Sequence, residues 1–190
     1  VVFGSLQIRN MATIGGNIGS ASPIGDTLPL LFVYNATVEL ASEAGGRRTL
    51  PIEDFITGYR KTALKRDELI VSVTVPRPSA GTIVKSYKVS RRIDLDISTV
   101  SAAFALKLKQ DNVVENIMMA YGGMAAQTQR ARSAESFLQG KVWNMENILP
   151  AMAMVEKEFT PLSDARADAE SRKIAASNLL LKFYHQTLES

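Results

Sequence analysis

The segment Thr13-Ile14-Gly15-Gly16-Asn17-Ile18-Gly19-Ser20-Ala21-Ser22-Pro23-Ile24-Gly25-Asp26 decides the fold of this chain. Its glycines, together with Asn17 and Pro23, predict an irregular turn rather than a regular helix or strand. Gly15 and Gly16 have no Cβ, so their backbone can adopt positive φ and another molecule can approach it closely. Successive N–H groups in such a turn can bind an anion. From this spacing alone, a glycine-rich connection without a ligand remains the favoured alternative.

A short helix is expected directly after this segment, with Asp26 as its N-cap and residues 27–34 as its body. Pro29 falls in the first turn, where a missing N–H costs no intrahelical bond. A carboxylate at this helix end would repel a phosphate. We therefore expect Asp26 to accept a hydrogen bond from a hydroxyl, such as that of a ribose or a ribityl chain. The Gly15-Gly16 turn would then face the phosphates or the edge of a flavin.

The composition excludes several classes of protein and site. The 190 residues carry a net charge of +3 with dispersed basic side chains, which argues against nucleic-acid binding. No apolar run approaches the roughly 20 residues that span a membrane, and we expect a cytoplasmic protein. With no cysteine and with His185 as the only histidine, disulfides, a thiolate nucleophile, a cysteine-ligated iron–sulfur cluster and a histidine-rich metal site are excluded. Electron transfer through this chain would need an organic cofactor.

The rest of the sequence predicts an α+β fold in two units. Strands are expected over residues 36–42, 47–50 and 69–75, and the last of these ends at Pro76. The segment Arg77-Pro78-Ser79-Ala80-Gly81 has the composition of a linker. We therefore expect a first domain over residues 1–78 and a second over residues 83–190.

The second unit is expected to combine a small antiparallel sheet with C-terminal helices. Its strands are predicted over residues 83–90, 99–109 and 113–121, with a tight hairpin at Gln110-Asp111-Asn112. Its helices are predicted over residues 134–139, 145–159 and 168–188. Ser133 is expected to cap the first of these helices.

Several motifs together resemble one family. They are Gln7-Ile8-Arg9-Asn10-Met11-Ala12-Thr13-Ile14-Gly15-Gly16-Asn17-Ile18, Ala21-Ser22-Pro23-Ile24-Gly25-Asp26, Gly58-Tyr59-Arg60-Lys61-Thr62, Asp67-Glu68-Leu69-Ile70, Tyr87-Lys88, Ser90-Arg91-Arg92 and Tyr121-Gly122-Gly123-Met124-Ala125. The first two closely resemble the FAD-binding segment of the xanthine dehydrogenase family of molybdenum hydroxylases. The resemblance covers nearly the whole chain, which looks most like the small, FAD-carrying subunit of the bacterial members.

This resemblance implies a fold and a cofactor site. The first unit would be the second part of a PCMH-type FAD-binding domain, and the second unit would be like the C-terminal domain of CO dehydrogenase flavoproteins. Because the chain does not begin with Met, and because the family has a further part of the FAD domain upstream, we expect a fragment. The residues that the resemblance assigns to FAD are Phe3, Thr13, Ile14, Gly15, Gly16, Asn17, Asp26, Ile70 and Lys88.

The resemblance also implies roles for these residues. Thr13 to Asn17 would contact FAD through backbone and the Asn17 amide, and Phe3 would pack on an adenine or flavin face. Ile70 would touch the cofactor with its backbone or its side chain. The Lys88 ammonium would stabilise negative charge on the reduced flavin. No residue is a convincing general acid or base, and no metal ligand is expected in this chain.

The function implied by the family is that of an oxidoreductase component. FAD would receive electrons from 2Fe-2S clusters on a partner and pass hydride to NAD, while purine oxidation takes place on a molybdopterin-binding large subunit. The chain would thus work in a hetero-oligomer, and the loop from Arg91 to Asp96 would influence access of NAD. Two alternatives stay open. The chain could be the flavin module of an aldehyde or carbon monoxide dehydrogenase, or a non-catalytic module that only docks to partners.

Overall fold

The computed structural model describes residue 4 and residues 6–92 and 96–189. The helices of the N-terminal part are α1 (Leu6–Met11), α2 (Ile14–Gly19), α3 (Leu28–Val33) and α4 (Ile52–Phe55). Its strands are β1 (Thr37–Ser42), β2 (Gly46–Pro51), β3 (Ile56–Gly58), β4 (Lys61–Thr62) and β5 (Leu69–Thr74). β1, β2 and β5 form an antiparallel sheet in the order β2-β1-β5, and β3 pairs with β4.

The C-terminal part is built on a second antiparallel sheet, in the order β6-β7-β8-β9. Its strands are β6 (Thr82–Val89), β7 (Val100–Leu108), β8 (Val114–Gly122) and β9 (Gln129–Arg130). Its helices are α5 (Arg132–Leu138), α6 (Met145–Glu158) and α7 (Ala169–Leu188), and the 3-10 turn η1 (Gln110–Asn112) joins β7 to β8. The α+β prediction is therefore confirmed. Within the described ranges, no helix is both long and apolar enough to span a membrane.

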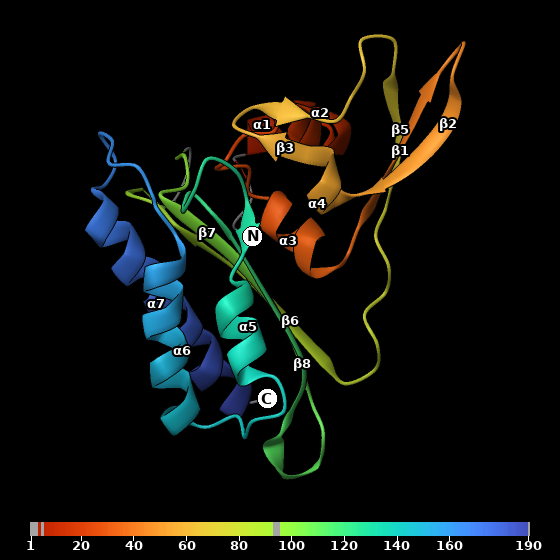
Figure 1. Ribbon diagram of the computed structural model, residues 1–190. Helices are drawn as coiled ribbons and strands as arrows, with labels where there is room; N and C mark the ends of the chain where they lie inside the picture. Colours follow the sequence, from red (N-terminus) through yellow and green to blue (C-terminus); the bar gives the residue numbers. More distant parts are fainter. Residues whose placement is uncertain (1–3, 5, 93–95, 190) are drawn as a thin grey trace.

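Helices cover the two faces of this sheet unequally. The helices α5, α6 and α7 lie on one face, and α3 lies on the other (Figure 1). Alternation along β7 explains the difference, since successive side chains point to opposite faces. Phe104 and Leu106 are buried toward the three helices, whereas Ala103 and Ala105 are buried toward α3. The small side chains let α3 approach the strands closely.

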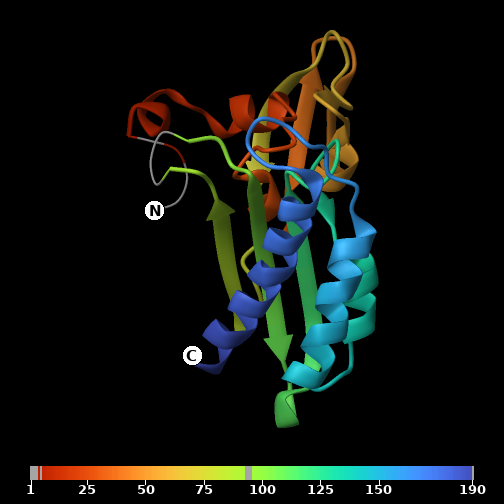
Figure 2. The ribbon, with the colours of Figure 1, turned by 90° about the vertical axis from the view of Figure 1, so that its left-hand side faces the viewer.

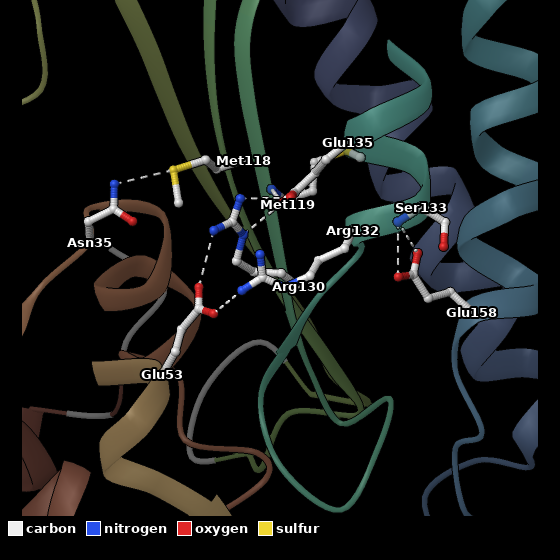
Figure 3. A network of polar contacts seen from close by, with 9 residues as sticks. All are labelled: Asn35, Glu53, Met118, Met119, Arg130, Arg132, Ser133, Glu135 and Glu158. Atoms are coloured by element: carbon white, nitrogen blue, oxygen red, sulfur yellow. Dashed lines mark hydrogen bonds and ion pairs between the residues drawn. The ribbon is translucent and has the colours of Figure 1, made fainter. Parts of the chain in front are cut away.

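The two parts of the chain share a hydrophobic core on the α3 side of the sheet. Ala103, Met118 and Ala120 of the sheet pack in one cluster with Leu28 and Phe32 of α3. A polar network also joins the parts (Figure 3). In it, Glu53 of α4 accepts a hydrogen bond from Arg130 Nη1 at 3.2 Å, and Arg130 Nη2 donates to Glu135 of α5 at 2.7 Å.

The N-terminal helix α1 contributes nothing to either core. None of its residues is buried, and it lies at the edge of the molecule, away from the helical layer (Figure 2). Met11 at its end is 86% exposed. The stability of the described fold therefore comes from the elements that follow α1.

Three local predictions were wrong. The glycine-rich segment forms the short helix α2, because the Thr13 side chain caps it and accepts a bond from Gly16 N. Asp26 does not cap α3, since Thr27 occupies the N-cap position and makes no side-chain cap bond. Ser133 does not cap α5 but lies inside it, where its backbone N–H donates to the Glu158 carboxylate.

Candidate functional site

The helix α2 presents an open stretch of backbone. Thr13 Oγ1 accepts the Gly16 N–H at 2.9 Å, and Thr13 O accepts the Asn17 N–H at 3.0 Å. A Cβ at Gly15 would meet no atom within 4 Å, and one at Gly16 would meet only Thr13 Oγ1, at 3.0 Å. Neither Gly15 nor Gly16 has positive φ. Their value in this site is the missing side chain, which leaves the backbone accessible to a ligand.

Asp26 is the centre of a largely buried polar cluster with Lys88 and Ser98, the Asp26 cluster. Its Oδ2 accepts a bond from Lys88 Nζ at 2.7 Å, and its Oδ1 accepts a bond from the Ser98 hydroxyl. The Asp26 and Lys88 side chains are only 14% and 12% exposed. Burying two charged groups to this degree costs desolvation free energy, which is offset only when the two groups pair with each other. Pairing with Lys88 and Ser98 therefore accounts for both Asp26 oxygens, and the side chain makes no cap bond to α3.

Side-chain contacts connect the Asp26 cluster to α2. The Thr27 hydroxyl, next to Asp26 in the chain, donates to Asn17 Oδ1 of α2. On another side of α2, a Cβ at Gly19 would lie 3.4 Å from Ile70 Cδ1 of β5. The structure therefore brings together the predicted residues Asn17, Asp26, Ile70 and Lys88. Of the other predicted residues, Thr13, Ile14, Gly15 and Gly16 lie on or beside α2, and Phe3 lies outside the described residues.

A cavity of about 270 Å³ opens beside Ser22 and Pro23, a few residues before Asp26. Tyr59 and Arg60 line it from the β3–β4 turn, and Asp164 lines it from the segment between α6 and α7. Arg60 has a φ of +51°, which non-glycine residues rarely adopt. Arg60, Arg166 and Arg172 line it as well, so the residues around the cavity include three arginines and the single carboxylate of Asp164. This balance favours an anionic ligand.

The carboxylate of Asp164 is held ionised in this wall. Burial by itself raises the pKa of Asp164. Hydrogen bonds from the backbone N–H groups of Arg166 and Ala167 and from the Arg172 side chain together outweigh burial and lower this pKa to about 2. The bonds from Arg166 N and from Arg172 Nη2 to Asp164 Oδ1 are both 2.8 Å long. Asp164 therefore keeps its negative charge throughout the physiological pH range and fixes the segment around it.

A second cavity, of about 550 Å³, adjoins the segment from Asp164 to Arg166 on its other side. Arg91, Arg92 and Asp96 line it. Arg91 Nη1 donates to Ala165 O at 3.1 Å. The pKa of Asp96 is lowered, chiefly by the hydrogen bond from the Arg92 backbone N–H. The loop that the family resemblance associates with NAD access thus contacts the wall of the first cavity.

Sequence reasoning missed Thr27, Ser98 and Arg172. Ser98 lies 72 positions from the Asp26 that it contacts, and a lone serine after a charged loop carries no periodic signal. Arg172 stands within a helical pattern, where an arginine is ordinarily exposed. A usable signal existed for Tyr59 and Arg60, because both lie in the Gly58-Tyr59-Arg60-Lys61-Thr62 motif of the family resemblance. The structure places both of them at the cavity.

Comparisons with known protein families match both parts of the chain. Residues 1–78 match the FAD binding domain in molybdopterin dehydrogenase. Residues 85–187 match the CO dehydrogenase flavoprotein C-terminal domain.

Curated relatives contain a similar sequence within much longer chains. A xanthine dehydrogenase of Oryza sativa is 41% identical over 192 residues, covering 98% of this chain and 14% of the relative. A nicotinate hydroxylase of Emericella nidulans is 38% identical, covering 96% of this chain and 14% of the relative. The chain thus spans about one seventh of the length of these relatives.

Solved structures share the fold. A carbon monoxide dehydrogenase chain from Hydrogenophaga pseudoflava matches with a TM-score of 0.89 and 30% identity, covering 95% of this chain and 62% of that chain. Quinoline 2-oxidoreductase from Pseudomonas putida 86 matches with a TM-score of 0.86 and 26% identity, covering 97% of this chain and 65% of that chain. The chain belongs to the family of FAD-binding flavoprotein modules of molybdenum hydroxylases.

Proposed function

We propose that this chain is the FAD-binding electron-transfer component of a xanthine dehydrogenase complex that reduces NAD during purine oxidation. One observation carries the proposal: the Asp26 cluster is joined through the Thr27–Asn17 bond to the open glycine helix α2. We also propose the division into a FAD-binding unit over residues 1–78 and a flavoprotein C-terminal unit over residues 83–190. The two family matches support this division.

The residues around α2 fit FAD in their chemistry. The free space beside Gly15 lets a ligand lie directly on the backbone. Asn17 offers an amide N–H₂ group, because its Oδ1 already accepts the Thr27 hydroxyl. Each Asp26 oxygen accepts one bond from the protein and can accept another, so a ribose or ribityl hydroxyl remains a suitable partner. We propose contacts from Thr13, Ile14, Gly15, Gly16, Asn17, Asp26, Ile70 and Lys88, and we retain Phe3 from the family resemblance.

The Asp26–Lys88 pair sets the local charge. Lys88 is bonded to Asp26, so the pair is neutral overall, and its ammonium keeps two further donors for a ligand. A donor fixed in this way needs little reorganisation when negative charge develops beside it. FAD, when bound, supplies hydride transfer to NAD and one-electron exchange with iron–sulfur clusters. The contribution of this chain is to position the cofactor and to hold charge beside it.

We propose that the cavity beside Pro23 receives NAD. Arg60 and Arg166 suit a pyrophosphate group, and Tyr59, 58% exposed at its rim, offers a ring on which a planar base can stack. The neighbouring segment from Ser22 leads directly to the Asp26 cluster. This adjacency is what an acceptor that takes hydride from FAD requires.

The substrate of the complex is oxidised outside this chain in the proposed arrangement. The 41% identity to a xanthine dehydrogenase supports purine oxidation. The 38% identity to a nicotinate hydroxylase supports a second candidate, in which the same module serves a complex that hydroxylates another nitrogen heterocycle. In both cases we propose a hetero-oligomer in the cytoplasm, with a molybdopterin-binding large subunit, a 2Fe-2S domain and the remaining part of the FAD domain as partners.

The test uses the intact protein that contains this chain. Bound FAD is measured from the flavin absorbance after release, and acceptor use is measured as anaerobic reduction of the bound flavin by NADH. We expect a yellow protein that NADH reduces, and we expect Asp26→Ala to lose most of its FAD. Asp54→Ala, which removes an exposed carboxylate of α4, should retain it. A wild-type protein that binds partners but no FAD would overturn the proposal in favour of a docking module. A flavin that NADH leaves oxidised would refute the acceptor.

A further inference from the structure

Arg172 of α7 is a buried charge that the proposed function does not use. Its side chain is 4% exposed. A guanidinium removed from water at this depth is costly unless it is hydrogen-bonded and paired. Its Nε has no hydrogen-bond partner among the described residues, so this arginine is not optimised for stability alone. The acceptors that its two other nitrogens, Nη1 and Nη2, bind indicate its role.

The guanidinium of Arg172 joins three segments that are distant in sequence. Nη1 donates to Thr99 O and, at 3.2 Å, to Gly123 O, while Nη2 donates to Asp164 Oδ1 at 2.8 Å. Gly123 and Asp164 line the cavity beside Pro23. Thr99 is joined by a peptide bond to Ser98 of the Asp26 cluster, and its own N–H donates to Val89 O at 2.8 Å, one residue after Lys88.

The backbone around Arg172 is adapted to this arrangement. Gly123 has a φ of +80°, and a Cβ there would lie 2.5 Å from Thr99 O and 3.3 Å from Arg172 Nη1. The Gly123 N–H also donates to Pro23 O at 2.7 Å, on the chain segment that leads to Asp26. Only a glycine allows Thr99, Gly123 and the guanidinium to approach this closely. Arg172 thus fastens the wall of the cavity to the backbone that carries the Asp26 cluster.

We propose that Arg172 is a positioning residue, which fixes the wall formed by Gly123 and residues 162–166 relative to the Asp26 cluster. The inference rests on the proposed function, in which the cofactor lies at the Asp26 cluster and the acceptor lies in the cavity. Hydride transfer demands that the two ligands keep a defined separation. Lysine could keep the charge, but its single ammonium lacks the planar fork that reaches three acceptors. The shape of the Arg172 group, rather than its charge, is the property that matters.

The matched control is Arg130, another arginine with low exposure that is held by ion pairs. Its side chain is 16% exposed and it pairs with Glu53 and Glu135 (Figure 3). It lines neither the cavity beside Pro23 nor the Asp26 cluster. Arg130→Met should therefore weaken the fold in the way that loss of Arg172 does, without moving the proposed acceptor site.

The first experiment measures the loop directly, in the intact protein. Limited trypsin digestion with mass spectrometry follows cleavage after Arg166, in the segment that Asp164 and Arg172 hold. We expect Arg172→Met and Arg172→Lys to speed this cleavage at least tenfold, and Arg130→Met to leave it near the wild-type rate. Asp164→Asn, which removes one acceptor at a half-exposed position, should speed it three- to fivefold. Wild-type cleavage rates in both Arg172 variants would overturn the inference.

The second experiment measures the effect on the acceptor. The dissociation constant for NADH is obtained from the concentration dependence of anaerobic reduction of the bound flavin, with FAD content measured in the same samples. Arg172→Met and Arg172→Lys should weaken NADH at least tenfold at near-normal FAD content, and Arg130→Met should bind it as the wild type does. Full recovery in Arg172→Lys would contradict positioning, because charge alone would then suffice. If the wild-type flavin is not reduced by NADH, the proposed acceptor fails, and the trypsin result alone judges the role of Arg172.

Discussion

The two faces of the four-stranded sheet are packed for different purposes. The face toward α5, α6 and α7 carries large side chains, and Phe104 lies there with ring centroids 5.4 Å from Tyr121 and 5.2 Å from Phe183. The face toward α3 carries alanines. At the end of this face lies Gly122, where an added Cβ would lie 3.1 Å from Pro23 O. Large rings stabilise one face. Small residues on the other let the segment before α3 approach β6, so that Asp26 meets Lys88.

The largest effect is expected where the ring cluster is broken. Phe104→Ala removes a fully buried ring that contacts three others and should cost about 3–5 kcal/mol of unfolding free energy. Urea denaturation followed by circular dichroism measures the loss. The control Met11→Ala, at an 86% exposed position of α1, should change stability by no more than about 0.5 kcal/mol. Equal losses for the two variants would show that the helical face is not the stabilising one.

An intermediate effect is expected just after β8, where the chain packs tightly against Thr99 and Arg172. Gly123 and Gly140 both have positive φ, at +80° and +76°. A Cβ added at Gly123 would lie 2.5 Å from Thr99 O, whereas one added at Gly140 would meet no atom within 4 Å. Gly140→Ala should cost about 1–2 kcal/mol from backbone strain alone. Gly123→Ala should cost about 1–3 kcal/mol more, because the backbone must also move. Denaturation of both variants measures the difference, and equal costs would mean that the backbone at the end of β8 is not closely packed against Thr99 and Arg172.

A smaller, pH-dependent effect is expected in the sheet of β1, β2 and β5, where polar contacts supplement the core. Arg48 Nε and Nη2 donate to the Glu68 carboxylate at 2.6 and 2.7 Å. The side-chain hydrogen bonds from Arg48 come first among the causes that lower the Glu68 pKa from 4.5 to about 2. Because the folded-state pKa is depressed, Glu68 stabilises the fold above pH 4.5, and this contribution is lost as the pH falls toward 2.

The variant Glu68→Gln separates this contribution from the rest. At pH 6 it should be less stable than the wild type, and the gap should narrow steadily as the pH falls from about 4.5 toward 2. Urea denaturation at a series of pH values measures the gap. A gap that stays constant across this range would mean that the Arg48–Glu68 pair does not depress the pKa.

The predictable parts of the fold are those with periodic or local signals. The strands expected over residues 99–109 and 113–121 and the turn between them predicted the central hairpin, where Asp111 and Asn112 adopt φ of 59° and 54°. Asn144 marks the start of α6, and its side chain accepts a bond from Asn147 N at 3.1 Å. These features depend on residues a few positions apart, so the sequence contains all the information that they need.

The site was less predictable because its contacts are remote in sequence. Glycine content argued against a helix in residues 14–19, but the Thr13 cap and the bonds within α2 overrode that tendency. Asp26 was expected at a helix N-cap from local sequence, and Lys88, 62 positions away, takes its carboxylate instead. The family resemblance brought Asp26 and Lys88 into one predicted site, but it did not reveal that they bind each other. The role proposed for Arg172 had no signal in the sequence at all.

The central claim is that FAD lies on the open backbone of α2 beside the Asp26 cluster, and Gly15→Val tests it most directly. A side chain at Gly15 meets open space in the protein, and valine is a better helix former than glycine, so the fold should be as stable as the wild type. The measurement is the FAD content of the purified intact protein, with thermal unfolding as the check on folding. The account predicts a folded protein that has lost most of its flavin, and a folded Gly15→Val protein with a full complement of FAD would contradict it.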